Sequence, residues 1–238
     1  MKRLDVIIAE HQNISRSKAK EMIVNGWVSI QNQVITKPSF LVEGFDAVAL
    51  HLPDTLYVSR GGQKLEHALS VFQLTVTDKT CMDIGASTGG FTDCLLQHGA
   101  KLVYAIDVGT NQLHPSLQNH PQIISLENTN IRTTPDLPQT ELIVIDVSFI
   151  SLTLVLPIVY DLLAQGGICL PLIKPQFEVG AKHLNKQGVV KDKKIVDRCL
   201  KNIEQHVTAL GFHFSGKTIS PITGKNGNTE YFFALRKE

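Results

Sequence analysis

The sequence predicts an α/β chain in which a small α+β domain precedes a larger, doubly wound domain with a mostly parallel sheet. Two observations predict this class. From Tyr57 onward, short apolar runs alternate with helical stretches, which is typical of a parallel sheet covered by helices on both faces. Before that point, two short amphipathic helices are followed by brief strands around polar turns. With 238 residues, the chain has room for both domains, which we place at residues 1–58 and 59–238.

Composition and charge exclude several classes of protein. Hydrophobic residues make up 43% of the chain and charged residues 19%, as in ordinary globular proteins. The longest charge-free apolar stretch, residues 147–160, contains Pro157 and is shorter than the roughly 20 residues of a membrane helix. The four cysteines have neither a CxxC pair nor metal-type spacing, which favours reduced core residues and a cytoplasmic location. Because the net charge is only +1, any basic surface for nucleic acid has to be local.

The smaller domain is expected to contain two helices and several short strands. Leu4, Ile7 and Ile8 mark the first helix, and Ser15 is the expected N-cap of a second helix that stops at Asn25–Gly26. Strands are expected at residues 27–30 and 33–35, and as a strand pair around Gly44 within residues 41–50. The exposed side of the second helix carries three basic residues, Arg16, Lys18 and Lys20. On composition alone, they fit a solvated helix face as well as a surface for nucleic acid.

The larger domain is expected to alternate between strands and helices. The candidate strands are residues 81–84, 102–107, 122–126, 142–146, 168–173 and 230–235. The candidate helices are residues 62–73, 90–98, 151–164 and 190–210. In sheets of this kind, ligands bind at the carboxyl ends of the strands, near the point where the strand order reverses.

A glycine-rich turn follows the first strand of the larger domain. Gly85, Gly89 and Gly90 have the spacing GxxxGG, whereas the fingerprint of dinucleotide-binding proteins is GxGxxG. Asp83 precedes the turn, where a carboxylate could meet an amino group, and Asp107 ends the next strand, where a carboxylate could bind two ribose hydroxyls. The ribose site suits NAD and S-adenosylmethionine equally well. The glycine spacing favours S-adenosylmethionine.

Charged residues also occur where a buried sheet should not have them. Asp146 and Lys174 each end an apolar strand, Glu230 begins the last candidate strand, and Lys64 lies in the helix before the first. Singly, such residues are often caps or solvated side chains. Two carboxylates and two lysines that converge beside one cofactor form a cluster of the kind that catalysis uses.

The order of these four residues resembles the Lys-Asp-Lys-Glu tetrad of the FtsJ-like ribose 2'-O-methyltransferases. The strings YVSRGGQKL, DIGASTGGFTD, DVGTNQLH, VIDVSFISL, KPQFE, GVVKD and SPITGKNGNTE resemble the TlyA (hemolysin A) family of ribosomal RNA 2'-O-methyltransferases. The first 50 residues, which include RLDVIIAEHQNISRSKAKEMIVNGWVSI, resemble the S4 RNA-binding domain. The resemblance covers essentially the whole chain. It implies a Rossmann-like S-adenosylmethionine-dependent methyltransferase fold with a mostly parallel seven-stranded sheet, preceded by an S4-like domain.

The resemblance also implies the reaction, which is methylation of a ribose 2'-oxygen, of cytidine, in ribosomal RNA. The ribose hydroxyl must lose its proton as it attacks the sulfonium methyl group, and a neutral lysine can take that proton. We assign this role to Lys174, with Lys64 as a neighbouring positive charge and with Asp146 and Glu230 orienting the lysines. No metal is required. The expected cofactor contacts are Asp83, Gly85, Ser87, Gly89, Gly90, Phe91, Asp107, Val108, Asn130 and Asp146.

Ribosomal RNA or ribosomal subunits are the expected partners, and membrane binding is not expected. Between residues 174 and 201 there are eight Lys or Arg against three acidic residues, whereas residues 141–173 contain no Lys or Arg. This local basic stretch fits RNA as well as an ordinary salt-bridged helix. The expected RNA contacts are Arg3, Arg16, Lys18, Lys20, Arg60, Lys182 and Lys191. The sequence does not specify an oligomeric state, and a monomer is compatible with it.

Three alternatives remain open on the sequence. The first is a membrane-active hemolysin, which the charge-free run is too short to support. The second is a non-catalytic RNA-binding factor in ribosome assembly. The presence of all four tetrad residues argues against it. The third is a base methyltransferase or an NAD enzyme on the same fold, and neither an NPPY-like strand end nor GxGxxG is present.

Overall fold

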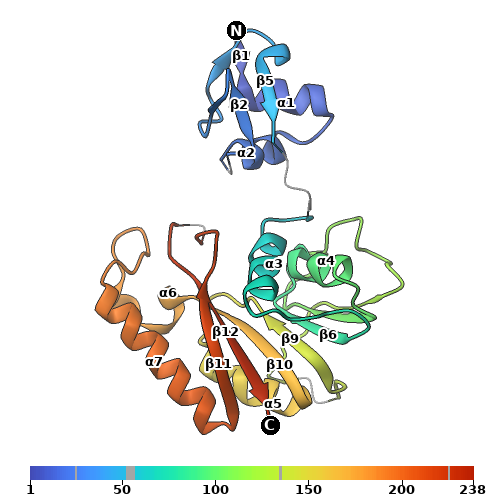
Figure 1. Cartoon of the computed structure of the whole chain (residues 1–238), viewed down its shortest axis with the longest axis vertical. Coiled ribbons are helices and arrows are strands. Elements are labelled where there is room, and N and C mark those ends of the chain that lie inside the picture. Colours follow the sequence, from blue (N-terminus) through green and yellow to red (C-terminus); the bar gives the residue numbers. More distant parts are fainter. Residues whose placement is uncertain (25, 52–56, 134–135, 225) are drawn as a thin grey trace. The chain divides into compact units, whose positions relative to one another are not determined.

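The computed structural model describes residues 1–24, 26–51, 57–133, 136–224 and 226–238 (Figure 1). The chain forms two compact units, Met1–Leu56 and Tyr57–Glu238. They are called unit 1 and unit 2 below, and each is described by itself. Their boundary lies two residues before the one expected from the sequence.

Unit 1 packs two helices against short strands. Its elements are β1 (Lys2–Arg3), α1 (Leu4–Gln12), α2 (Arg16–Val24), β2 (Val28–Ile30), β3 (Gln33–Val34), β4 (Leu41–Val42) and β5 (Val48–Leu50). Leu4, Ile8 and Ile23 have no exposed surface and form the centre of its core. The predicted N-cap is confirmed, since the Ser15 hydroxyl accepts a hydrogen bond from the Lys18 amide at 3.1 Å. Asn25, part of the predicted helix stop, lies outside the described residues.

The predicted strand pair at residues 41–50 is wrong. These residues do contain two strands, but β4 pairs with β1, whereas β5 pairs with β2. A 3-10 turn at Phe45–Ala47 separates them. Because this turn follows Gly44 directly, the chain passes from one small sheet to the other instead of folding back on itself.

Unit 2 is built on a seven-stranded sheet with the order β11-β12-β10-β9-β6-β7-β8 (Figure 1). The strands are β6 (Thr80–Ile84), β7 (Leu102–Ile106), β8 (Ile123–Leu126), β9 (Thr140–Ile145), β10 (Leu163–Ile173), β11 (Phe212–Ile219) and β12 (Tyr231–Lys237). Strands β8, β7, β6, β9 and β10 are parallel, and β12 is antiparallel to both of its neighbours. The carboxyl ends of β6, β7, β9 and β10 therefore lie at one edge of the sheet, which is where such sheets bind ligands.

Helices cover both faces of this sheet, as predicted. They are α3 (Gly61–Val71), α4 (Gly90–Gln97), α5 (Leu156–Leu162) and α7 (Lys193–Ala209), while the short α6 (Pro175–Glu178) follows the end of β10. Alternate residues of the inner strands pack on opposite faces: Cys81 belongs to the core cluster of α3 and α4, and Met82 to that of α5 and α7. All four cysteines are free and buried, in agreement with the prediction of core thiols.

Two predictions about elements of unit 2 are wrong. Residues 212–219 were not among the candidate strands, yet they form the edge strand β11. Its exposed side carries three polar residues and Ile219, while Phe214 packs edge-on against Phe233 with 4.8 Å between the ring centres. The predicted helix at 151–164 is divided into a 3-10 turn at Leu152–Leu154 and the short α5. Leu163 already belongs to β10, so this strand begins five residues earlier than expected.

Within the described part of the chain, no helix combines the length and the apolar character that a bilayer crossing requires.

Candidate active site

Two cavities open at the edge where the parallel strands end. We call the first the tetrad cavity: it has a volume of about 820 Å³, and Lys64, Asp146, Lys174 and Glu230 line it. We call the second the glycine-turn cavity: it has a volume of about 760 Å³, and Gly85, Asp107, Val108, Asn130 and Asp146 line it. The two share a wall formed by Gly85, Ser87, Asp146, Ser148 and Phe149. Groups bound in the two cavities would therefore meet at this wall.

The glycine turn brings the ends of β6 and β9 together. Gly85 follows β6 with a φ of 87°, in the left-handed region that favours glycine. A Cβ atom at Gly85 would lie only 2.6 Å from the carbonyl oxygen of Asp146. Because glycine has no side chain, the turn can follow this path and the Asp146 backbone can lie close to Gly85.

Gly85→Ala is therefore expected to weaken cofactor binding about tenfold or more, because the added methyl group must displace the backbone at Asp146 and take up a strained φ. Isothermal titration with S-adenosylhomocysteine measures the loss. Gly166→Ala is a matched control, since Gly166 also has a positive φ but has open space around it. Equal affinities in the wild type and Gly85→Ala would contradict the expectation.

Asp107 is oriented by the backbone around it. Its carboxylate accepts hydrogen bonds from the Ser87 amide at 2.8 Å and from the Gly109 amide at 2.7 Å. Each carboxylate oxygen therefore has one fixed donor and a further lone pair for another donor. This arrangement suits a pair of neighbouring ribose hydroxyls.

Asp83 lies behind the turn. It has no exposed surface and lines neither of the two cavities. One oxygen accepts a hydrogen bond from the Thr92 hydroxyl at 2.7 Å, so the carboxyl group connects β6 to the first turn of α4. Burial raises the pKa of Asp83 to about 7, and the hydrogen bond from Thr92 opposes this shift.

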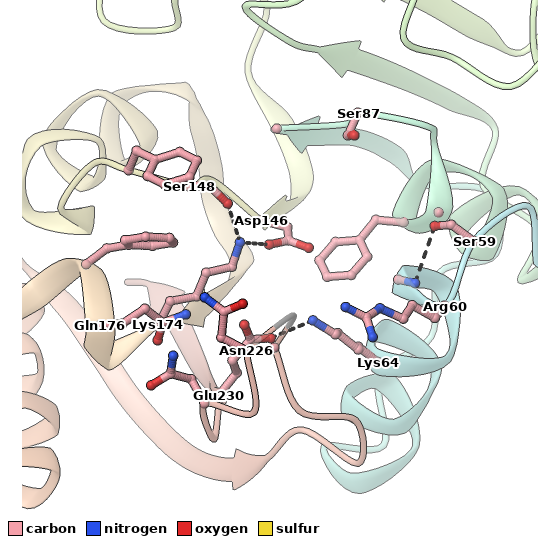
Figure 2. A pocket seen from close by; sticks show the side chains of 18 of the residues that line it. Ser59, Arg60, Lys64, Ser87, Asp146, Ser148, Lys174, Gln176, Asn226 and Glu230 are labelled. Atoms are coloured by element: carbon pink, nitrogen blue, oxygen red, sulfur yellow. Dashed lines mark hydrogen bonds and ion pairs between the residues drawn. The ribbon is translucent and has the colours of Figure 1, made fainter. Parts of the chain in front are cut away.

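The four tetrad residues form two lysine–carboxylate pairs, shown in Figure 2. Lys64 Nζ lies 2.5 Å from Glu230 Oε2, and Lys174 Nζ lies 2.5 Å from Asp146 Oδ1. The Lys64 and Glu230 side chains are only 7% and 3% exposed. The sequence predicted that these residues converge, and the described geometry brings all four into one cavity.

The residues of this cavity that the sequence interpretation missed include Ser148, Phe149 and Phe177. Ser148 accepts a hydrogen bond from Lys174 Nζ at 2.8 Å. Phe149 is 89% exposed at a φ of 63°, and its ring lies 4.9 Å from that of Phe177. All three occur in strings quoted above, but a serine or phenylalanine beside a motif carries no chemical signal of its own.

Glu178 joins the segment after β10 to the loop after β9. Its carboxylate accepts hydrogen bonds from the Ser151 hydroxyl at 2.6 Å and from the Leu152 amide at 2.9 Å. The other end of the loop after β9 is held by a hydrogen bond that the Asp146 amide donates to the carbonyl oxygen of Ile84 at 2.9 Å. The residues between these contacts are thereby fixed relative to Lys174.

The expected cofactor residues separate into three groups. Those that line the glycine-turn cavity are Gly85, Ser87, Asp107, Val108, Asn130 and Asp146. Gly90 and Phe91 line the tetrad cavity. Gly89 and Asp83 line neither, although Gly89 has the positive φ, 89°, that begins α4.

The expected RNA contacts of unit 2 lie at or outside the tetrad cavity. Arg60 lines it, next to Lys64 (Figure 2). Lys182 and Lys191 are exposed on the segment between α6 and α7. In unit 1, Arg16 and Lys20 are exposed on α2, and Lys18 pairs with Glu21 at 3.5 Å.

Arg3 and Arg16 also have a structural role in unit 1, which the sequence did not reveal. Asp5 is buried and accepts hydrogen bonds from Arg3 at 2.9 and 3.0 Å and from Arg16 at 3.2 Å. The Arg3 guanidinium holds the pKa of Asp5 below its usual range, against the opposite effect of burial, and the charge of Arg16 adds to the lowering.

Asp5→Asn is consequently expected to destabilise unit 1 at pH 7. Because the folded-state pKa of Asp5 is depressed, its stabilisation is present above the ordinary carboxyl pKa of about 4 and is lost as the pH falls through the lower folded value. The only tryptophan of the chain, Trp27, belongs to this unit, so its fluorescence can follow unfolding. A difference between variant and wild type that persists unchanged at pH 2 would argue against the ion pairs as its source.

Comparisons with known proteins agree with this architecture. The family model of the FtsJ-like methyltransferases matches residues 57–237, and that of the S4 domain matches residues 2–48. A Mycobacterium tuberculosis protein named 16S/23S rRNA (cytidine-2'-O)-methyltransferase TlyA is 41% identical, over 94% of this chain and 85% of that protein. A solved structure described as a hemolysin from Streptococcus thermophilus is 39% identical, covers 99% of this chain and 88% of that one, and has a TM-score of 0.77.

A more distant structure bears on the fold alone. A protein from Listeria monocytogenes described as an S-adenosylmethionine-dependent methyltransferase is 15% identical and has a TM-score of 0.58 over 76% of this chain and 100% of that one. The predicted fold class is therefore confirmed. The enzyme class, that of a methyltransferase, follows from the family match over residues 57–237 and the 41% identical relative. The chain belongs to the TlyA (hemolysin A) family, in which an S4 domain is joined to an FtsJ-like methyltransferase domain.

Proposed function

We propose that this protein transfers a methyl group from S-adenosylmethionine to the ribose 2'-oxygen of a cytidine in ribosomal RNA. One observation carries the proposal: two lysine–carboxylate pairs lie in a cavity that shares a wall with the cavity of the glycine turn. A methyl donor in one cavity and a nucleotide in the other would be adjacent at Asp146. The name of the 41% identical relative supports the choice of cytidine and of ribosomal RNA.

The glycine-turn cavity fits an adenosine cofactor. Asp107, oriented by two backbone amides, is suited to the ribose hydroxyls, and Val108 and Asn130 extend the same wall. Gly85 allows the Asp146 backbone to approach the turn more closely than any side chain would permit. When bound, S-adenosylmethionine would supply a methyl group already activated by its sulfonium charge.

Lys174 is the residue that we propose as general base. Neutral Lys174 accepts the proton of the 2'-hydroxyl, and the oxygen uses the freed electron pair to bond to the methyl carbon. The bound cofactor would supply that methyl group and keep the electron pair of its carbon–sulfur bond, and the proton remains on Lys174 until water removes it. Asp146 orients Lys174 in this step, and the buried Lys64–Glu230 pair forms the opposite side of the cavity.

The RNA would be held by basic side chains outside the reacting centre. Arg60 at the cavity, Lys182 and Lys191 beyond it, and the exposed basic residues of unit 1 are suited to phosphate contacts. Such contacts make binding depend steeply on salt concentration. The cytoplasmic location expected from the cysteines stays a prediction.

The test is incubation of ribosomal subunits that lack the modification with S-adenosylmethionine labelled in its methyl group. We expect the label on the 2'-oxygen of a cytidine, mapped by nuclease digestion and mass spectrometry. A label on a base would overturn the proposal. Binding of both cofactor and subunits without any transfer would favour the non-catalytic assembly factor instead.

A further inference from the structure

Among the residues that the structure describes, Lys174 has two polar partners, and one of them, Ser148, lies outside the tetrad. Nζ lies 2.5 Å from Asp146 Oδ1 and donates to the Ser148 hydroxyl at 2.8 Å. Both partners come from the loop after β9, two residues apart, whereas Lys174 follows β10 (Figure 2). The Lys174 side chain is only 10% exposed, so these two contacts largely determine where its amino group points.

The number of hydrogens on the amino group makes the second partner important. A neutral lysine has two N–H bonds and one lone pair on Nζ. If Asp146 and Ser148 each accept one N–H, the lone pair occupies the remaining position. Without Ser148, one N–H has no fixed acceptor, and rotation about the Cε–Nζ bond places the lone pair in several directions.

The position of Ser148 is itself fixed by the surrounding structure. It lies in the loop that the Asp146 amide and the Glu178 carboxylate hold at either end. The next residue, Phe149, adopts a φ of 63°, which is costly for a residue with a bulky side chain. Such strain persists only where the surroundings hold it, and it is frequent at functional sites.

Ser148 also lines both cavities, as does Asp146. Its hydroxyl is therefore at the wall where the methyl group would cross from donor to acceptor. We propose that Ser148 is a positioning residue that, together with Asp146, aims the lone pair of Lys174 at the ribose 2'-hydroxyl. This inference rests on the proposed function and adds to it a residue outside the tetrad.

The experiment compares single-turnover methyl transfer by the wild type, Ser148→Ala, Ser148→Thr and Ser125→Ala, with unmodified ribosomal subunits as acceptor. Ser148→Ala is expected to lower the rate constant about tenfold, with the KM for the subunits and the affinity for S-adenosylhomocysteine within about twofold of the wild type. Ser148→Thr keeps the hydroxyl and is expected to recover most of the rate. Ser125→Ala makes the same chemical change on β8, away from both cavities.

The outcomes separate the two proposals. If the wild type places no methyl group on a ribose, the proposed function fails and this inference fails with it. If the wild type methylates a ribose and Ser148→Ala does so at the same rate, only the inference is overturned. A loss that Ser148→Thr shares, or that appears as weaker cofactor binding with an unchanged rate constant, would likewise assign Ser148 a merely structural role.

Discussion

Lys174→Met is expected to reduce ribose methylation by about 100-fold or more, the usual contribution of a general base, while binding of S-adenosylhomocysteine stays within about twofold. The two effects should separate because Lys174 lines the tetrad cavity and not the glycine-turn cavity. Transfer of labelled methyl groups under single-turnover conditions measures the rate, and isothermal titration measures cofactor binding.

Lys174→Arg distinguishes the proton-accepting role from the charge. A guanidinium keeps the positive charge beside Asp146 but does not become neutral in proteins. We therefore expect Lys174→Arg to be nearly as impaired as Lys174→Met. If the arginine variant retained most of the wild-type rate, Lys174 would be acting as a fixed charge, and the proton would have to leave by another route.

Glu230→Gln is expected to lower the free energy of unfolding of unit 2 by about 3 kcal/mol, since it leaves the ammonium group of Lys64 buried without its counter-charge. The pair is 7% and 3% exposed, so water can compensate little of this loss. For a domain of this size, the change corresponds to a fall in Tm of roughly 6–12 °C. Scanning calorimetry measures it, and Trp27 fluorescence identifies the separate transition of unit 1.

The double variant Lys64→Met/Glu230→Gln is the matched control. It removes the charge along with its partner, and buried ion pairs are often replaced by uncharged groups at little cost. We expect it to recover most of the lost stability. A double variant as unstable as Glu230→Gln would show that packing around Glu230, and not the uncompensated charge, determines the loss.

The sequence predicted those site residues whose charge is unusual for their position. Asp146 and Lys174 are conspicuous because a charge directly follows an apolar strand, and strand order then determines that they meet. Ser148 and Glu178 are ordinary residue types for their local sequence. Their roles depend on contacts between segments that are 26 residues apart in the chain. Asp5 is similar: one acid in a short helix gives no indication that two arginines enclose it.

The fold was predictable to the same degree and for a related reason. Inner strands such as β7 and β9 consist mostly of apolar residues because both of their faces are buried. The edge strand β11 has one exposed side, so its alternating pattern with a central glycine, Gly216, is weak. β4 pairs with β1 and not with β5 because of the 3-10 turn at Phe45–Ala47. No residue type in that segment predicts this turn.

The place of β12 in the sheet has a consequence for the order of events during synthesis. Of the seven strands of this sheet, β12 is synthesised last, yet it is inserted between β10 and β11, and Glu230 just before it pairs with Lys64 from 166 residues earlier. Unit 1 is complete long before that moment and can fold first. In a nascent chain, unit 1 could thus be folded while the tetrad cavity still lacks Glu230 and β12. Activity would then begin only after β12 has been synthesised, in a single step.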